Sequence, residues 1–186
     1  ARPDSFLDEI SVYKTRRRFG KALAQQWEER GSPTPDVVIP IPDSARDAAL
    51  SMAHYLKVSY REGFIKNRYV GRPFIMPNQG ERRSAIRRKL NPIPLEFEGK
   101  NVLLVDDSIV RGNTSRKTVE VARRAGAKNV YFASTSPPLI APCPYGIDMA
   151  TKNEFIATGR SVDEIATEIG ADYLLYLDRE RMIEAA

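Results

Sequence analysis

Two adjacent aspartates, Asp106 and Asp107, directly follow a wholly apolar run over Val102–Val105. Such a run is typical of a buried parallel strand, which would deliver both carboxylates to the carboxyl edge of a sheet. Gly112 then allows the backbone to come close to a ligand. A helix predicted to begin near Thr114 has free N–H groups and a positive dipole end, which favour a phosphate. Carboxylates beside a phosphate cradle suit a sugar phosphate, because they bind vicinal hydroxyls or Mg²⁺.

Two acids alone would be better explained as caps of a helix, with the glycine as a plain turn. It is the complete string of strand, acid pair, glycine and threonine that favours the ligand site.

A second feature is the basic stretch from Lys66 to Leu90, in a chain with a formal net charge of +5. Its cations, opposed only by Glu81, are Lys66, Arg68, Arg72, Arg82, Arg83, Arg87, Arg88 and Lys89. Glycines and prolines interrupt the stretch, so we expect a loop rather than a helical DNA-binding stripe. One interpretation is a solvated basic face. We favour a flexible loop, about residues 66–90, that orders over a polyphosphate ligand.

The elements that must position these groups alternate along the chain. Hydrophobic periodicity predicts helices over residues 13–30, 43–56, 114–125 and 161–169. Apolar runs predict strands over residues 36–41, 60–65, 101–105, 129–135 and 173–177. Asp43 or Ser44 is the expected cap of the second helix, and Ser161 with Glu164 forms a capping-box pattern. This order predicts an α/β fold with a mainly parallel sheet and helices on both faces.

Composition is that of one globular domain spanning residues 1–186, with 42% hydrophobic and 28% charged residues. No apolar run reaches the roughly 20 residues that a membrane-spanning helix needs. The single cysteine, Cys143, is compatible with a reducing cytosol, so we expect a cytoplasmic protein. We expect neither a membrane nor a nucleic acid as partner. Since the chain begins at Ala1 and not at Met, we expect processing or a cut from a longer chain.

The string from Val105 to Thr114 resembles the phosphoribosyl-diphosphate signature of type I phosphoribosyltransferases. Four further segments resemble consecutive landmarks of the amidophosphoribosyltransferase family: Ala1–Ser5, Ile39–Ser44, Lys66–Arg72 and Tyr145–Asp148. The resemblance implies the type I phosphoribosyltransferase fold. It also implies conversion of 5-phosphoribosyl diphosphate and ammonia to 5-phosphoribosylamine and pyrophosphate, the first committed step of purine synthesis.

The resemblance assigns roles to individual residues. Asp106 and Asp107 would be catalytic, binding the ribose hydroxyls and the Mg²⁺ shell. Lys66 would be catalytic and face the phosphates, and Ser44 would lie near the metal. The substrate-binding residues would be Asp43, Ser44, Ala45 and Arg46 in a pyrophosphate loop, together with Lys66, Arg72 and Ser108. The 5′-phosphate cradle would be formed by Val110, Arg111, Gly112, Asn113 and Thr114.

The sequence departs from the family pattern in two respects. The family's glutaminase domain begins with a nucleophilic cysteine, whereas residue 1 here is Ala. We therefore expect that domain to be absent and glutamine not to be the direct nitrogen source. Some members carry an iron–sulfur cluster, and Cys143 resembles one ligand position. One thiol cannot hold a four-iron cluster, so we expect none in this chain.

The expected partners are phosphoribosyl diphosphate, ammonia, nucleotide feedback inhibitors and, in the full-length enzyme, further copies of the same subunit. Three other functions fit parts of the sequence: a nucleobase phosphoribosyltransferase, a receiver-like sensor, and a non-catalytic regulator that binds phosphoribosyl diphosphate. Whether the isolated domain turns over is left open by the sequence.

Overall fold

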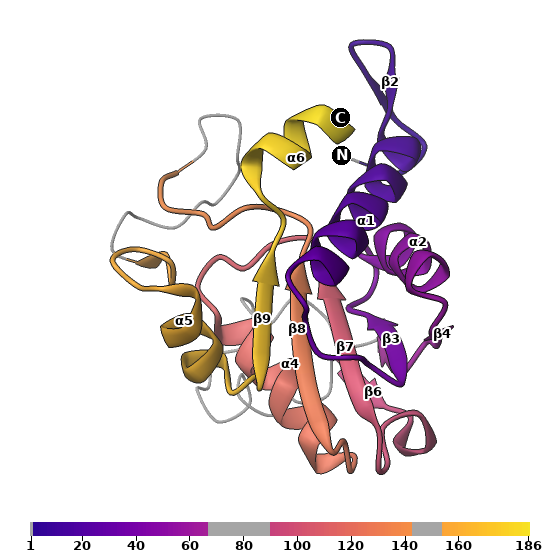
Figure 1. Ribbon diagram of the computed structural model, residues 1–186, viewed down its shortest axis with the longest axis vertical. Coiled ribbons are helices and arrows are strands. Elements are labelled where there is room, and N and C mark those ends of the chain that lie inside the picture. Colours follow the sequence, from indigo (N-terminus) through magenta and orange to yellow (C-terminus); the bar gives the residue numbers. More distant parts are fainter. Residues whose placement is uncertain (1, 67–89, 143–153) are drawn as a thin grey trace, which may run out of the picture.

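The protein is described here by a computed structural model that covers residues 2–66, 90–142 and 154–186 (Figure 1). A central parallel sheet has the strand order β4-β3-β7-β8-β9. The helices are α1 (Val12–Glu29), α2 (Arg46–Leu56), the 3-10 helix η2 (Pro94–Glu96), α4 (Asn113–Arg124), α5 (Val162–Ile169) and α6 (Arg179–Ala185). The strands are β1 (Phe6–Leu7), β2 (Ile10–Ser11), β3 (Val37–Pro40), β4 (Ser59–Tyr60), β5 (Phe64–Lys66), β6 (Leu90–Pro92), β7 (Asn101–Asp106), β8 (Asn129–Ser134) and β9 (Tyr173–Tyr176).

The central position of β7 in the sheet explains why the residues before the acid pair are apolar. Val102 to Val105 are completely buried, since helices cover both faces of the sheet. Val102 lies in register with Val37 of β3 and with Val130 of β8. With the register fixed along these strands, their carboxyl ends meet at one edge.

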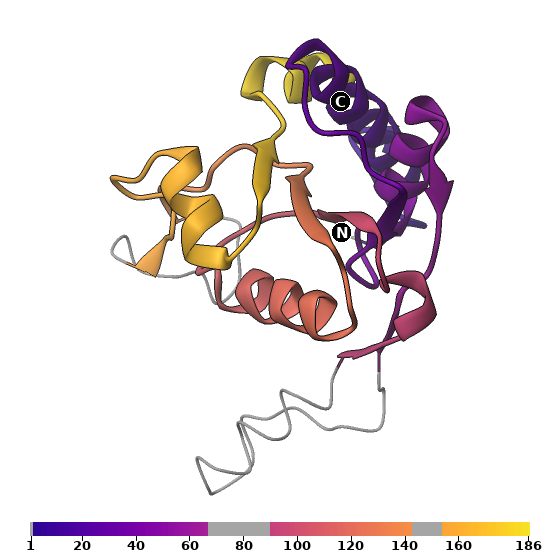
Figure 2. The same ribbon diagram turned by 60° about the horizontal axis from the view of Figure 1, so that its bottom comes forward.

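Two helical layers enclose the sheet, as Figure 2 shows. On one face α1 and α2 pack over a core that includes Leu23, Met52 and Leu103. On the other face α4 and α5 pack over a core that includes Leu104 and Ile165. The predicted α/β architecture, with a mainly parallel sheet and helices on both faces, is confirmed.

The two helices of the first layer touch through a glycine. A Cβ atom placed on Gly20, in the middle of α1, would lie 2.1 Å from the carbonyl oxygen of Ala48 in α2. Only a residue without a side chain permits this approach, so Gly20 sets how closely α2 lies against α1.

The strand predicted over residues 60–65 is wrong in one respect, because the structure divides it between two sheets. Ser59 and Tyr60 form β4 at an edge of the main sheet, whereas Phe64 to Lys66 pair with β6 in an antiparallel ribbon. Gly63 lies between them, where a Cβ would meet Ile39 at 2.6 Å. The chain thus turns over the core here and leaves the main sheet.

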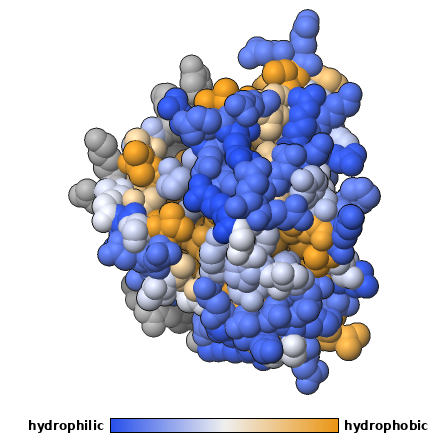
Figure 3. All heavy atoms as spheres, viewed as in Figure 1, coloured by the Kyte–Doolittle hydropathy of each residue, from blue (hydrophilic) through white to orange (hydrophobic). Residues whose placement is uncertain are grey.

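Helix α6, the hairpin β1–β2 and the ribbon strand β6 were not predicted. The hairpin exposes Phe6 and Leu7, whose accessible fractions are 70% and 59%. The face shown in Figure 3 is otherwise mostly hydrophilic, with apolar side chains in small groups. No helix within the described ranges is long and apolar enough to cross a membrane.

Candidate active site

Three neighbouring strands end together at the carboxyl edge of the sheet. Pro40 of β3 pairs with Val105 of β7, and Asp106 pairs with Ser134 of β8. Just beyond, the Ile41 amide donates to the Val105 carbonyl at 2.8 Å, and the Thr135 amide donates to the Asp106 carbonyl at 3.0 Å. The loops after β3, β7 and β8 therefore start side by side, where ligands bind in such folds.

The acid pair lies at the end of β7, as predicted, but its two members differ in environment. Asp106 is 8% exposed, whereas Asp107 is exposed. Burial raises the pKa of Asp106 to about 7, and the charge of Asp107 adds to this shift. The Asp107 amide donates to Asp106 Oδ1 at 2.9 Å and partly offsets it. A buried carboxyl with a raised pKa beside an exposed carboxylate is suited to bind hydroxyls or a cation.

The loop from Asp107 to Gly112 leads into α4, and Gly112 is its critical residue. Gly112 has a φ of +73°, and a Cβ there would lie 2.3 Å from Ile156 Cδ1. No side chain caps α4 and no acid lies in its first turn. Because Asn113 and Thr114 are exposed, this helix start offers its amides to an anion.

The other predicted members of this loop have local partners. The Ser108 hydroxyl donates to Asp107 Oδ1 at 3.2 Å, and the Val110 carbonyl accepts from the Ile156 amide at 2.9 Å. Arg111 pairs with Glu154 at 3.0 Å. The loop is thus anchored on residues 154–156 while its helix end stays open.

The second predicted loop, Asp43 to Arg46, follows β3. Asp43 is exposed, Ser44 and Arg46 are half-buried, and Ala45 is buried. The expected cap was wrong, because Ala45 occupies the N-cap position and makes no side-chain cap bond. Asp43 accepts a 2.9 Å hydrogen bond from Lys66 Nζ.

Lys66 reaches this loop from the end of the ribbon β5–β6, where it pairs with Leu90. The structure therefore brings Lys66 to the predicted pyrophosphate loop, although 23 residues separate it from Asp43 in the sequence. Arg72, the remainder of the predicted flexible loop and Cys143 lie outside the described residues. Their predicted roles stay predictions.

Two residues near the site had no signal in the sequence. Thr135, 8% exposed, donates from its hydroxyl to the Asp107 carbonyl at 3.3 Å. Glu62 lies 3.3 Å from Arg46 Nε. Only the pairing of β8 with β7, and of β4 with β3, places these residues beside the loops.

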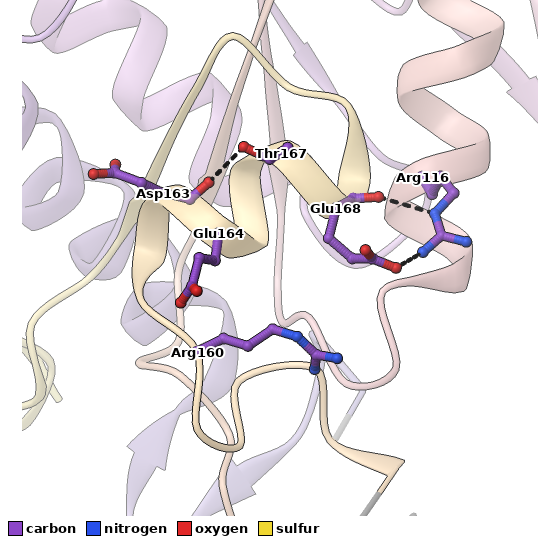
Figure 4. A pocket seen from close by; sticks show the side chains of 6 residues that line it. All are labelled: Arg116, Arg160, Asp163, Glu164, Thr167 and Glu168. Atoms are coloured by element: carbon purple, nitrogen blue, oxygen red, sulfur yellow. Dashed lines mark hydrogen bonds and ion pairs between the residues drawn. The ribbon is translucent and has the colours of Figure 1, made fainter.

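A hollow of about 610 Å³ lies elsewhere, over α4 and α5 (Figure 4). Arg116 crosses it to bond Glu168, and Arg160 donates to the Ile156 carbonyl. None of its lining residues belongs to the predicted site. Within the described ranges, no group of three or more His, Cys, Asp or Glu residues is arranged to hold a metal.

Comparison with known proteins fits this geometry. The phosphoribosyl transferase domain family matches residues 13–136. The chain is 55% identical over its whole length to an amidophosphoribosyltransferase of Pseudomonas aeruginosa and 54% identical to that of Escherichia coli. It covers 37% of each of these proteins, so it spans little more than a third of their length.

A solved structure gives the same picture. The glutamine phosphoribosylpyrophosphate amidotransferase of B. subtilis, complexed with ADP and GMP, superposes with a TM-score of 0.87 and 46% identity. The match covers 100% of the present chain and 40% of that protein. The predicted type I fold and the resemblance to amidophosphoribosyltransferases are both confirmed.

Proposed function

Since the chain belongs to the phosphoribosyltransferase domain family, we propose that it transfers the phosphoribosyl group of 5-phosphoribosyl diphosphate to ammonia. The products are 5-phosphoribosylamine and pyrophosphate, and the reaction is the first committed step of purine synthesis. In a longer protein with a glutaminase domain, glutamine would supply the ammonia.

The observation that carries this proposal is the meeting of three features at one sheet edge. These are the acid pair Asp106–Asp107, the uncapped start of α4 behind Gly112, and the Asp43–Lys66 pair on the neighbouring loop. They match the three parts of the substrate: the ribose hydroxyls, the 5′-phosphate and the pyrophosphate.

Mg²⁺ is the cofactor that the family resemblance implies, and the residues present fit it. Mg²⁺ is commonly bound through one or two carboxylates together with substrate phosphates, rather than by an all-protein cage. The adjacent carboxyls of Asp106 and Asp107 offer such a set, and the half-buried Ser44 hydroxyl belongs to the adjacent loop. When bound, Mg²⁺ would neutralise charge on the departing pyrophosphate.

In the proposed reaction, ammonia attacks the anomeric carbon. A C–N bond forms, the C–O bond to pyrophosphate breaks, and pyrophosphate leaves with the bonding electron pair. The ammonium formed then loses a proton to water. Lys66 and Arg46 would stabilise the charge that develops on the leaving group, and the acid pair would orient the ribose.

The remaining partners are proposed from similarity. Purine nucleotides are candidate feedback inhibitors, because the B. subtilis relative is complexed with ADP and GMP. A homo-oligomer and a cytoplasmic location stay predictions.

The test is release of pyrophosphate from phosphoribosyl diphosphate and Mg²⁺ at raised pH, where more ammonia is unprotonated. We expect release with ammonium chloride, formation of phosphoribosylamine by mass spectrometry, and no release with glutamine. Release only with a purine or pyrimidine base would favour a nucleobase phosphoribosyltransferase. Tight binding without turnover under any condition would favour a regulator.

A further inference from the structure

A row of five polar side chains runs from β4 to the ribbon β5–β6 and passes through the loop after β3. Tyr60 donates to Glu62 Oε1 at 2.6 Å. Glu62 Oε2 lies 3.3 Å from Arg46 Nε, and Arg46 Nη2 lies 3.7 Å from Asp43 Oδ1. Asp43 Oδ2 accepts from Lys66 Nζ at 2.9 Å. Charges of alternating sign thus connect Glu62 to both proposed pyrophosphate-binding cations.

The contact between Glu62 and Arg46 is important because the Nε atom of Arg46 is buried. Its Nε is inaccessible to solvent and makes no hydrogen bond, although the Glu62 carboxylate is near. The side chain as a whole is 43% exposed, so other atoms of Arg46 reach solvent. A buried cationic N–H without a hydrogen bond depends on a neighbouring negative charge.

Glu62 is itself held in place. Tyr60 is half-buried, and burial together with Glu62 raises the pKa of its hydroxyl. The hydroxyl therefore remains a proton donor to Glu62 throughout the neutral range.

We propose that Glu62 is a positioning residue for the pyrophosphate end of the site. The Glu62 carboxylate attracts Arg46, so Arg46 does not pair fully with Asp43. Asp43 therefore remains the partner of Lys66. Without its charge, both cations would compete for Asp43, and the Nη groups of Arg46 would be less available to a ligand. This inference rests on the proposed function, since it needs a pyrophosphate group at this loop.

The test is Glu62→Gln, which keeps the size of the side chain and an acceptor for Tyr60 but removes the charge. Calorimetry on the whole 186-residue chain would use three ligands with Mg²⁺: inorganic pyrophosphate, phosphoribosyl diphosphate and ribose 5-phosphate. We expect the affinity for pyrophosphate and for phosphoribosyl diphosphate to fall roughly fivefold. This factor corresponds to the upper end of the energies measured for exposed ion pairs. Affinity for ribose 5-phosphate, which lacks the pyrophosphate, should not change.

Glu96→Gln is the matched control. Glu96 pairs with Arg61 at 3.7 Å and with Lys100 at 3.6 Å, neither of which belongs to the loop. This variant loses the same charge and should bind all three ligands as the unaltered chain does. In an Arg46→Met background, Glu62→Gln should have no further effect, because the residue through which it acts is gone.

Three results would overturn the inference: unchanged pyrophosphate affinity in Glu62→Gln, equal weakening of all three ligands, or an undiminished effect in the Arg46→Met background. Failure of the unaltered chain to bind any of the three ligands would instead refute the proposed function, and this inference with it.

Discussion

Replacing Gly20 by Ala tests the close contact between α1 and α2, the two helices of the first layer. In an isolated helix the change would stabilise by about 1 kcal/mol, because Gly is a poor helix former. Here the new Cβ would lie 2.1 Å from the Ala48 carbonyl oxygen and 2.7 Å from its Cα and carbonyl carbon. These are backbone atoms, which cannot rotate away as a side chain does, so the helices must separate.

Overpacking of a core costs about 1–3 kcal/mol, and a backbone contact belongs at the upper end of that range. Subtracting the gain in helix propensity of about 1 kcal/mol, we expect Gly20→Ala to lose about 2 kcal/mol of unfolding free energy. Since Ala48 lies near the start of α2, we also expect weaker binding of Mg²⁺-pyrophosphate at the loop that precedes this helix.

Urea unfolding followed by fluorescence measures this loss, because the single tryptophan, Trp27, is buried in α1. The adjacent exposed residue, Lys21, supplies the control. Lys21→Ala should be more stable than Lys21→Gly by about 1 kcal/mol, which gives the propensity difference at the same place in the helix. If Gly20→Ala proved as stable as the unaltered chain, or more so, the close contact between α1 and α2 would be refuted.

Three further changes test the site and its supports. Asp106→Asn with Asp107→Asn should weaken phosphoribosyl-diphosphate binding by a factor of about ten or more, since each hydrogen bond to a charged group contributes about 1.5–3 kcal/mol; unchanged affinity in calorimetry with Mg²⁺ contradicts the assignment. Gly112→Ala should lower the free energy of unfolding, measured with urea, by about 2–4 kcal/mol, whereas Gly159→Ala should lower it by about 1 kcal/mol, because Gly159 has a φ of +70° but open space around it. Equal losses would mean that the Ile156 contact is unimportant. Ser161→Ala should lower the free energy of unfolding by about 1 kcal/mol and Ser161→Gly by only about 0.3 kcal/mol, because Ser161 caps α5. A larger loss for Gly would argue against the cap.

Much of the fold could be predicted because its strands are buried on both faces. β7 and β8 contain unbroken apolar runs, and the acid pair that begins with the last residue of β7 marks where the chain leaves the core. Helix α5 was equally plain, because the Ser161–Glu164 capping box is encoded within four residues. Elements specified by nearby residues are therefore accessible from sequence.

The features that were missed depend on residues far apart in the chain. The ribbon β5–β6 pairs Phe64 with Pro92, and nothing near either residue in the sequence indicates that pairing. Thr135 reaches the acid pair across 28 residues, through the register of β7 with β8. Helix α6, Arg179–Ala185, has too little apolar sequence to show a period.

Gln26 has a consequence for how the chain folds as it is made. This buried side chain on α1 donates to the Tyr176 carbonyl and accepts from the Asp178 amide, 150 and 152 residues later. Until those residues have been made, the amide lacks both native partners, so the native packing of α1 cannot be completed. Contacts between residues this far apart in the sequence tend to slow folding, and chains that fold slowly expose apolar surface to aggregation for longer.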